Sequence, residues 1–384
     1  MASYPRFYFP TRIFSGAGSI EQLIAFVGAQ DAVFLITDAT LVQLGLVKRV
    51  TDMLDGHVRA LRVYDSVLPD PAIEMVCEAT EQAHAFGATA IVCVGGGSVI
   101  DAAKSVAMLL AHFPDYQPYA LRKRPPEHPS LPCYAIPTTA GTGAEASSAA
   151  VLSYNHVKGG IKAETMFLPA VFLDETMMLG LPQSITAETA MDALTHSVES
   201  YIGLHRQTIL DALNLHVVRL IFRYLPRAYA NGADQEARAA LTQAACMGGL
   251  AMGHSGTGLV HAFSNTMCEE YHDLSHGRSN SIFLPYCTRY NAPAVLDRLA
   301  DIAQAAGIQT LGLTAEQAGF AAVEAIEQLS DTVNIPKRVT GHTLSAARIA
   351  ELAENTRTHF ITANNPRVPS KEDLIKIIHQ AMPL

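Results

Sequence analysis

The sequence lacks several features that mark specialised classes of protein. Only 16% of its 384 residues are charged, and the formal net charge of −9 gives no electrostatic reason to expect nucleic acid or an anionic membrane as a partner. No uninterrupted apolar run approaches the roughly 18 residues that a membrane-spanning helix needs. The first ten residues lack the basic and apolar regions of a signal peptide, so we expect none.

Cysteine is scarce and scattered. The six cysteines are far apart and form no CxxC pair, which argues against a zinc ribbon or a redox motif. In a chain of this size they are expected to be reduced thiols, several of them buried as small apolar side chains. A reducing, cytoplasmic location fits this pattern.

Apolar residues, by contrast, are abundant. They make up 49% of the chain, which excludes a disordered or fibrous protein. A length of 384 residues exceeds one typical domain, so two packed domains are expected.

The first half of the sequence alternates short apolar runs with amphipathic stretches. Helical spacing of apolar residues appears at 71–86 and 99–112. Such alternation is typical of βαβ units and a mostly parallel sheet. The expected strands are 32–37, 59–64, 88–94 and 131–137.

The second half is different, because strand-like runs nearly vanish after residue 185. The sequence therefore predicts an α/β domain over residues 1–183, followed by an all-helical domain over residues 184–384. The segments with helical spacing are 187–204, 208–224, 234–253, 315–330 and 344–355.

Three glycines, Gly95, Gly96 and Gly97, follow an expected strand, and Ser98 opens an expected helix. Glycines let a backbone approach a pyrophosphate, and free amides at a helix N-terminus favour an anion. The pattern is not GxGxxG and it follows the third strand, so it is not the ordinary Rossmann fingerprint. A simple tight turn explains it equally well.

A second polar loop also follows a strand, and its hydroxyls belong to Thr138, Thr139 and Thr142. Two such loops at strand ends of one sheet favour a dinucleotide site. Asp38 ends the first strand, where a carboxylate accepts hydrogen bonds from a ribose and repels a 2′-phosphate, which favours NAD over NADP. The alternative for Asp38 is a helix N-cap or a turn residue.

Asp192 and His196 stand at i and i+4 of an expected helix and therefore share one face. A metal site and a simple Asp–His hydrogen bond are both open interpretations of this pair. His261 and His276 have apolar neighbours, where a lone histidine is more often a hydrogen-bonded core residue. Together the four would form a mixed N/O set suited to Fe²⁺, Zn²⁺ or Mn²⁺.

Six motifs occur in order along the chain: FYFPTRIFSGAGSIEQL (7–23), GGGSVIDAAK (95–104), PTTAGTGAEAS (137–147), MDALTHSVESY (191–201), GLVHAFS (258–264) and HGRSNSIFLPY (276–286). Together they resemble the iron-containing (group III) alcohol dehydrogenase family, and the resemblance covers essentially the whole chain. It implies a dinucleotide-binding α/β domain, a helical metal-binding domain and a cleft between them, in an architecture like that of dehydroquinate synthase.

The resemblance also implies site residues and an activity. The expected activity is hydride transfer between NAD(H) and a small primary alcohol, a diol or the corresponding aldehyde, in a homodimer with one divalent ion, Fe²⁺ being favoured. The implied metal ligands are Asp192, His196, His261 and His276. The implied cofactor contacts are Asp38, Gly95, Gly96, Gly97, Ser98, Asp101, Thr138, Thr139, Thr142 and Lys162.

Some positions depart from the family pattern. Asn265 stands where relatives often have a histidine implicated in proton movement, and His254 stands where they usually have asparagine. Ser275 replaces a common proline, and Cys268 replaces a glycine. Since Asn265 cannot act as an acid or base, we expect a water chain assisted by His272 or His254 to move the proton. The alternative for His272 is an exposed loop residue.

Three other functions are consistent with parts of this pattern. A glycerol-dehydrogenase-like polyol oxidoreductase would share the architecture with a different pocket and metal. A dehydroquinate-synthase-like lyase shares the fold, but its glutamate-plus-histidines site does not match Asp192 and His196. A non-catalytic dinucleotide- or metal-binding regulator would not need all four ligand types beside both cofactor loops.

Overall fold

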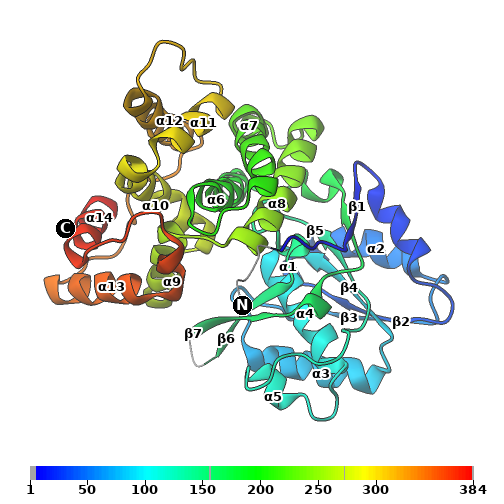
Figure 1. The fold of residues 1–384 in the computed structure, drawn as a ribbon. Helices are drawn as coiled ribbons and strands as arrows, with labels where there is room; N and C mark the ends of the chain where they lie inside the picture. The colour runs from blue at the N-terminus through cyan, green and yellow to red at the C-terminus, as the bar shows by residue number, and fades with distance from the viewer. Residues whose placement is uncertain (1–5, 155–156, 272, 383–384) are drawn as a thin grey trace. The chain divides into compact units, whose positions relative to one another are not determined.

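The computed structural model describes residues 6–154, 157–271 and 273–382. The chain forms two compact units: Tyr8–Gly180, and Leu181–Leu384 together with the residues up to Phe7 (Figure 1). We expected the division after residue 183 and the first residues in the α/β domain. Phe7 instead groups with the helical unit, where its ring lies 4.9 Å from that of His254.

The first unit is built on a six-stranded sheet in which every paired strand is parallel. The strand order is β1-β8-β5-β4-β2-β3. The bounds are β1 (Arg12–Ser15), β2 (Ala32–Ile36), β3 (Ala60–Tyr64), β4 (Ala90–Gly95), β5 (Cys133–Pro137) and β8 (Ala170–Leu173). The four strands expected from apolar runs are confirmed, and the edge pair β1 and β8 was missed.

Helices connect these strands, as parallel pairing requires. The two helices expected from the sequence are α3 (Ile73–Phe86) and α4 (Gly97–Leu110). The others are η1 (Ser19–Ala25), α1 (Ala39–Gln43), α2 (Leu46–Leu54), α5 (Gln117–Ala120), η2 (Ala144–Ala146), η3 (Glu164–Met166) and η4 (Glu175–Met178). A separate antiparallel hairpin joins β6 (Ala149–Tyr154) and β7 (Val157–Lys162).

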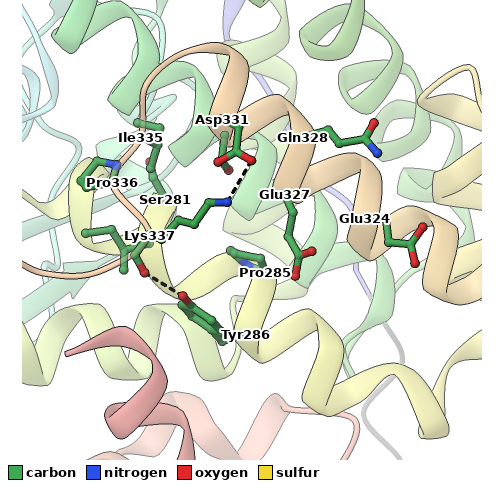
Figure 2. Close-up of a pocket in the computed structure, with 12 residues that line it drawn as sticks. Ser281, Pro285, Tyr286, Glu324, Glu327, Gln328, Asp331, Ile335, Pro336 and Lys337 are labelled. Carbon is green, nitrogen blue, oxygen red and sulfur yellow. Dashed lines mark hydrogen bonds and ion pairs between the residues drawn. The ribbon is translucent and has the colours of Figure 1, made fainter. Parts of the chain in front are cut away.

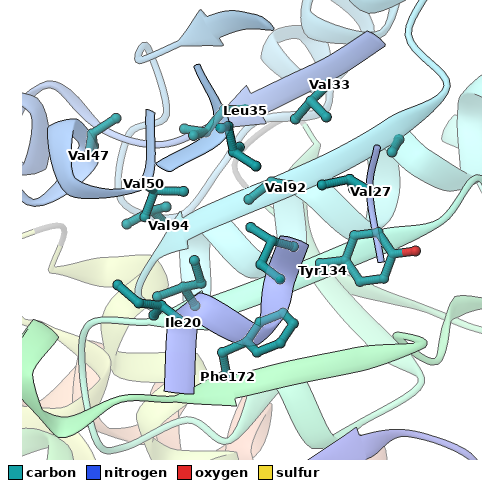
Figure 3. Close-up of a cluster of buried hydrophobic side chains, with 14 of the residues drawn as sticks. Ile20, Val27, Val33, Leu35, Val47, Val50, Val92, Val94, Tyr134 and Phe172 are labelled. Atoms are coloured by element: carbon teal, nitrogen blue, oxygen red, sulfur yellow. The ribbon is translucent and has the colours of Figure 1, made fainter. Parts of the chain in front are cut away.

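The core of this unit lies where one face of the sheet meets η1 and α2. Val33, Leu35, Val92 and Val94 alternate along β2 and β4, and all four are fully buried (Figure 3). A strand that is buried on both faces needs a nearly continuous apolar run, and β2 and β4 have one. This rigid layer fixes the loops that leave the carboxyl ends of the strands.

The second unit is helical in its described residues. Its helices are α6 (Gln183–Ile202), α7 (Thr208–Ala230), α8 (Gln235–Ser255), α9 (Leu259–Glu270), α10 (His276–Asn291), η5 (Ala292–Ala294), α11 (Leu296–Ala305), α12 (Ala315–Thr332), α13 (Ala346–Thr358), η6 (Phe360–Asn364) and α14 (Lys371–Ala381). The predicted fold class, α/β followed by all-α, is confirmed.

Helix α6 is the centre of the helical unit. It is buried almost throughout from Thr186 to Ile202, and it packs against α7, α8, α9 and α10 (Figure 1). Its buried face carries several polar side chains, which a purely structural helix would not need. None of the described helices is both long enough and apolar enough to cross a bilayer.

Candidate metal centre and dinucleotide loops

Four side chains from three helices converge in the helical unit. Asp192 and His196 lie one turn apart on α6, His261 lies in the first turn of α9, and His276 is the first residue of α10. One oxygen, Asp192 Oδ1, lies 3.8 Å from His196 Nε2, 3.9 Å from His261 Nε2 and 4.0 Å from His276 Nε2. The structure thus brings Asp192, His261 and His276 within 4.8 Å of one another, and His196 lies beside the same carboxylate oxygen.

Three of the four donors, Asp192, His261 and His276, point at one position. The amide Nδ2 of Asn280 lies 2.6 Å from Asp192 Oδ1, 3.2 Å from His261 Nε2 and 3.1 Å from His276 Nε2. Lone pairs that converge on a hydrogen-bond donor also suit a cation, because both carry positive charge toward them. One carboxylate and three imidazoles are a donor set that first-row divalent metals accept. The residues present therefore fit a metal ion.

Two hydrogen bonds behind the cluster fix the orientation of the imidazole rings. His261 Nδ1 donates to Glu199 Oε2 at 2.7 Å, while the other oxygen of Glu199 accepts the Val260 amide at 2.6 Å. His276 Nδ1 lies 3.2 Å from the hydroxyl of Ser264. In both rings this leaves Nε2 directed at Asp192, an arrangement that raises the basicity of a histidine ligand.

The charge state of Asp192 is also suited to a cation. Burial raises the pKa of this carboxyl group, but His196, His276, His261 and Asn280 together lower it by more, so the net pKa lies below its ordinary value. The carboxylate is therefore charged throughout the neutral range. The side chain of His276 is 32% exposed, whereas the other three donors are buried, so the cluster is open on the α10 side.

Two glycines let neighbouring helices approach the cluster. A Cβ at Gly248 of α8 would lie 3.2 Å from the carbonyl oxygen of Ala193. A Cβ at Gly277, which follows His276, would lie 2.9 Å from the carbonyl oxygen of Glu188. Both helices therefore pack directly against the backbone of α6.

A second hollow in the helical unit is distinct from this cluster. A cavity of about 380 Å³ lies between α10, α12 and the segment 335–337 (Figure 2). Asp331 pairs with Lys337 at 3.0 Å on its wall, and the Tyr286 hydroxyl donates to the Lys337 carbonyl at 2.7 Å. Among the described residues that line it, none is one of the four donors.

The two expected phosphate loops meet in the α/β unit. Gly95 ends β4, Gly96 is the N-cap of α4 and Gly97 begins that helix. A Cβ at Gly97 would lie 2.7 Å from Thr142 Cγ2, and one at Gly96 would lie 3.1 Å from Thr139 Oγ1. The close approach of the second loop thus leaves no room for a side chain at Gly97 and little room for one at Gly96.

The sheet topology places three of the expected cofactor residues on one edge. The chain runs outward from β2 to β3 and then returns through β4 to β5 and β8, so the order reverses between β2 and β4. Asp38 follows β2, Gly95 ends β4 and Thr138 follows β5, and these strands are neighbours. Ligands of open α/β sheets bind at such a reversal, at the carboxyl ends of the strands.

A buried lysine ties helix α4, which follows the first loop, to the segment 144–149, which follows the second loop. Lys104 of α4 is 1% exposed, and its ammonium donates to the carbonyls of Ala144 at 2.8 Å, Ser147 at 3.2 Å and Ala149. It also lies 3.4 Å from Asp101 Oδ1. Burial raises the pKa of nearby Glu145 to about 7, against the opposing charge of Lys104.

Several expected cofactor residues have structural contacts as well. Asp38 Oδ1 accepts the Leu41 amide at 3.0 Å and so caps α1, which is the alternative given for it above. Asp101 Oδ2 accepts the Val151 amide at 2.9 Å, and burial raises its pKa while Lys104 opposes that rise. Lys162 is exposed at the end of β7. A cofactor role for each of them stays a prediction.

The residues that depart from the family pattern lie on or next to helices α8, α9 and α10 of the helical unit. His254 lies in the last turn of α8, where Nδ1 is 2.9 Å from the Leu250 carbonyl. Asn265 is half-buried on α9, and Cys268 Sγ donates to the Leu274 carbonyl at 3.2 Å. Ser275 is the N-cap of α10. His272 lies outside the described residues, and the role of either histidine in proton transfer stays a prediction.

Sequence reasoning missed Asn280, Glu199, Ser264 and Glu188. All four stand within or beside motifs that were noticed, and Asn280 follows His276 by four residues, one helical turn. That spacing was the available signal. It could not show which of the many polar residues on these helices face the donors.

Comparison with known proteins agrees with this geometry. The protein-family model described as "Iron-containing alcohol dehydrogenase" matches residues 10–175. A second family model, described as "Fe-containing alcohol dehydrogenase family, C-terminal", matches residues 186–382. The long-chain-alcohol dehydrogenase 1 of Geobacillus thermodenitrificans is 32% identical, over 99% of this chain and 97% of that protein. The NAD-dependent methanol dehydrogenase of Bacillus methanolicus is 33% identical, over 98% and 99%.

A solved structure shows the same likeness. The crystal structure of a 1,3-propanediol oxidoreductase superimposes with a TM-score of 0.91 at 29% identity, covering 98% of this chain and 100% of that one. The family models together cover nearly the whole chain, and the two curated relatives match over almost their full length. The chain therefore belongs to the iron-containing alcohol dehydrogenase family.

Proposed function

We propose that this protein transfers a hydride between NAD(H) and a small primary alcohol, a diol or the corresponding aldehyde, with one divalent ion held by Asp192, His196, His261 and His276. The observation that carries the proposal is the convergence of three imidazole nitrogens on a single carboxylate oxygen, at 3.8–4.0 Å. Family membership makes the chain a nicotinamide- and metal-dependent oxidoreductase.

The helical domain is the proposed metal domain. Its mixed N/O donors accept Fe²⁺, Zn²⁺ or Mn²⁺, and the family favours Fe²⁺. When bound, such an ion polarises a carbonyl or lowers the pKa of an alcohol, and the nicotinamide supplies or accepts the hydride. Glu199 and Ser264 hold the rings of His261 and His276 in the orientation that this chemistry needs.

The α/β domain is the proposed dinucleotide domain. Backbone amides at the start of α4, from Gly97 and Ser98, would face the pyrophosphate, together with the hydroxyls of Thr138, Thr139 and Thr142. Asp38 would bind the ribose hydroxyls and disfavour a 2′-phosphate, so NAD is the proposed cofactor. Gly95, Gly96, Asp101 and Lys162 complete the proposed contact set.

A proton must also move between the substrate oxygen and water. Because Asn265 cannot carry it, we assign this step to a water chain assisted by His254 or His272. The pH dependence of kcat for His254→Ala and His272→Ala tests the assignment. Profiles unchanged from the parent in both variants would remove the histidines from the proton path.

Two further properties belong to the same proposal. A homodimer is expected for this family type, and sedimentation equilibrium of the purified enzyme tests it. A reducing, cytoplasmic location is supported by the six cysteines, all of which are free thiols. Fractionation of cells that produce the native chain tests that location.

Metal-dependent NADH oxidation with a panel of aldehydes tests the central proposal. The protein would be stripped with a chelator and reloaded with Fe²⁺, Zn²⁺ or Mn²⁺ in separate samples. Turnover that appears only after reloading is the expected result. In the reverse assay, which follows NAD⁺ reduction, faster turnover with glycerol than with primary alcohols would indicate a polyol oxidoreductase. Tight NADH binding without turnover of any aldehyde or polyol would contradict the proposal and favour a regulator.

A further inference from the structure

The first turn of α10 is tied to α6 by one buried carboxylate. Glu188 Oε2 accepts a hydrogen bond from the Ser275 hydroxyl at 2.7 Å, and Oε1 accepts one from Arg278 Nε at 2.8 Å. Glu188 is 6% exposed and lies one turn before Asp192 on α6. We call Glu188, Ser275 and Arg278 the α6–α10 clamp.

The clamp encloses His276. Ser275 precedes this residue, and its hydroxyl also accepts the Arg278 amide at 3.3 Å as the N-cap of α10. Gly277 follows it, and a Cβ there would lie 2.9 Å from the carbonyl oxygen of Glu188. The backbone on both sides of His276 is therefore fixed by the same residue of α6.

The hydrogen bonds of Glu188 include a charge-assisted one. Hydrogen bonds from an ionised donor to an ionised acceptor are shorter and stronger than neutral ones, and the Arg278–Glu188 bond is of this kind. A carboxylate this buried is costly unless it is paired, so Glu188 strongly favours the arrangement that pairs it. On the other side of His276, the Ser264 hydroxyl donates to its carbonyl oxygen at 3.3 Å.

We propose that Glu188 is a positioning residue for His276 and, through the α6–α10 clamp, sets the affinity of the centre for its metal ion. The inference rests on the proposed role of His276 as a metal ligand. A ligand at the first residue of a helix has no preceding turn to hold it, and metal sites need their donors held to within about 0.5 Å. The clamp supplies the missing constraint.

Metal affinity separates this proposal from a purely structural role. The full-length protein, stripped with a chelator, would be titrated with Co²⁺ alone and followed by the visible absorption of the bound ion. Glu188→Ala is expected to weaken binding about 10- to 100-fold, the usual effect of losing a partner that orients a ligand. Glu188→Gln should weaken it less, because its amide oxygen still accepts one of the two hydrogen bonds.

A matched control comes from a second carboxylate–arginine pair in the same unit. Asp211 accepts a hydrogen bond from Arg298 at 2.6 Å, on helices α7 and α11. Asp211→Asn should lower Tm without changing the affinity for Co²⁺. An equal loss of affinity in Asp211→Asn and Glu188→Ala would overturn the proposal, because general loosening of the unit would then explain both.

The backbone at Ser275 offers a rescue experiment. Its φ of −62° and ψ of 147° are the angles that proline adopts, so Ser275→Pro would stiffen the entry to α10, at the cost of the hydroxyl that accepts the Arg278 amide. In the Glu188→Ala background, Ser275→Pro is expected to restore part of the lost Co²⁺ affinity. No gain would contradict the proposal, because the position of this backbone would then not be what Glu188 controls.

Asp192→Ala, titrated with Co²⁺ in the same way, separates failure of the proposed metal centre from failure of the proposed role of Glu188. If Asp192→Ala binds Co²⁺ like the parent protein, the metal centre itself is wrongly assigned. If Asp192→Ala abolishes binding while Glu188→Ala leaves the affinity unchanged, the centre stands and only the clamp is wrong.

Discussion

The two units of this protein build their candidate sites by opposite means. The α/β unit uses glycines and threonines at the ends of neighbouring strands, and Lys104 of α4 bonds to the carbonyls of the segment that follows the second loop. The helical unit uses side chains: one carboxylate and three imidazoles, from the three helices α6, α9 and α10. Substitutions in the α/β unit should therefore weaken cofactor binding by changing the spacing of the loops. Substitutions in the helical unit should weaken metal binding by removing a single donor atom.

Their buried carboxyl groups show the same contrast. Burial raises the pKa of both Asp192 and Glu145, but three imidazoles surround Asp192 and reverse the effect. At Glu145 burial outweighs a backbone hydrogen bond and the charge of Lys104, so its pKa rises to about 7. A charged Asp192 suits a cation, whereas Glu145 is more stable as a neutral group beneath loops proposed to bind a pyrophosphate.

The largest expected effect is that of Asp192→Ala. Loss of the central oxygen should remove the metal and lower kcat/KM by about 100- to 1000-fold, which corresponds to the several kcal/mol that a Lewis-acid ion supplies. Metal content and steady-state kinetics measure this. The affinity for NADH, followed by fluorescence, should match that of the parent protein. A parallel loss of NADH affinity would show that the two units do not bind the metal and the cofactor independently.

Glu145→Gln should change the pH dependence of stability. The carboxyl group loses its proton near pH 4.5 in the unfolded chain and near pH 7 in the folded one, so the folded state binds more protons between these values. The parent therefore loses about 3 kcal/mol of stability from this group as pH rises through that window. The neutral variant avoids this loss and should be more stable at pH 8. Urea unfolding at pH 5 and pH 8 measures the difference, and equal changes in both proteins would contradict it.

Gly97→Ala should push the two cofactor loops apart, because its Cβ would lie 2.7 Å from Thr142 Cγ2. A misplacement of this size is expected to weaken NADH binding about 10- to 100-fold. Fluorescence titration measures it, with Gly160→Ala as control, since a Cβ there meets its nearest atom at 3.8 Å. Metal content should not change in either variant; a drop in Gly97→Ala would show that the two sites are not built independently.

Asp38→Asn is the mildest of these changes. Asparagine caps a helix as well as aspartate does, so α1 and the overall stability should be unaffected. Removing the charge should favour NADPH relative to NADH by about 1–2 kcal/mol, or about 5- to 30-fold. The ratio of kcat/KM for the two cofactors measures this, and an unchanged ratio would leave Asp38 as a cap alone.

The strands that the sequence predicts correctly are those whose environment is simplest. β2 and β4 are buried on both faces and need unbroken apolar runs, which are visible without a structure. β1 and β8 have four residues each, and β1 is mostly exposed, so composition does not distinguish them from loops. Helix α10 was not predicted, nor were α9, α11 and α14; α10 contains Pro285, which resembles a break, although the helix continues through it.

The sequence predicts those site residues whose relative positions depend on local chain geometry, and it does not predict the others. Helical spacing alone indicates the pair Asp192 and His196, and the loops at 95–98 and 138–142 follow from the strands before them. His261 and His276 came from family resemblance, since no spacing rule joins α6 to α9 and α10. Glu199, Glu188 and Asn280 depend on which way helices face, and that is decided by packing across the unit.

Helix α6 carries the residues that this centre depends on along a single stripe. Glu188, Asp192, His196 and Glu199 fall within an arc of about 80° around its axis, because each residue turns the helix by about 100°. Loops can gain or lose residues at little cost, but one residue inserted between Asp192 and His196 would rotate His196 and Glu199 away together. Between Glu188 and Glu199, this helix can therefore tolerate no change in length.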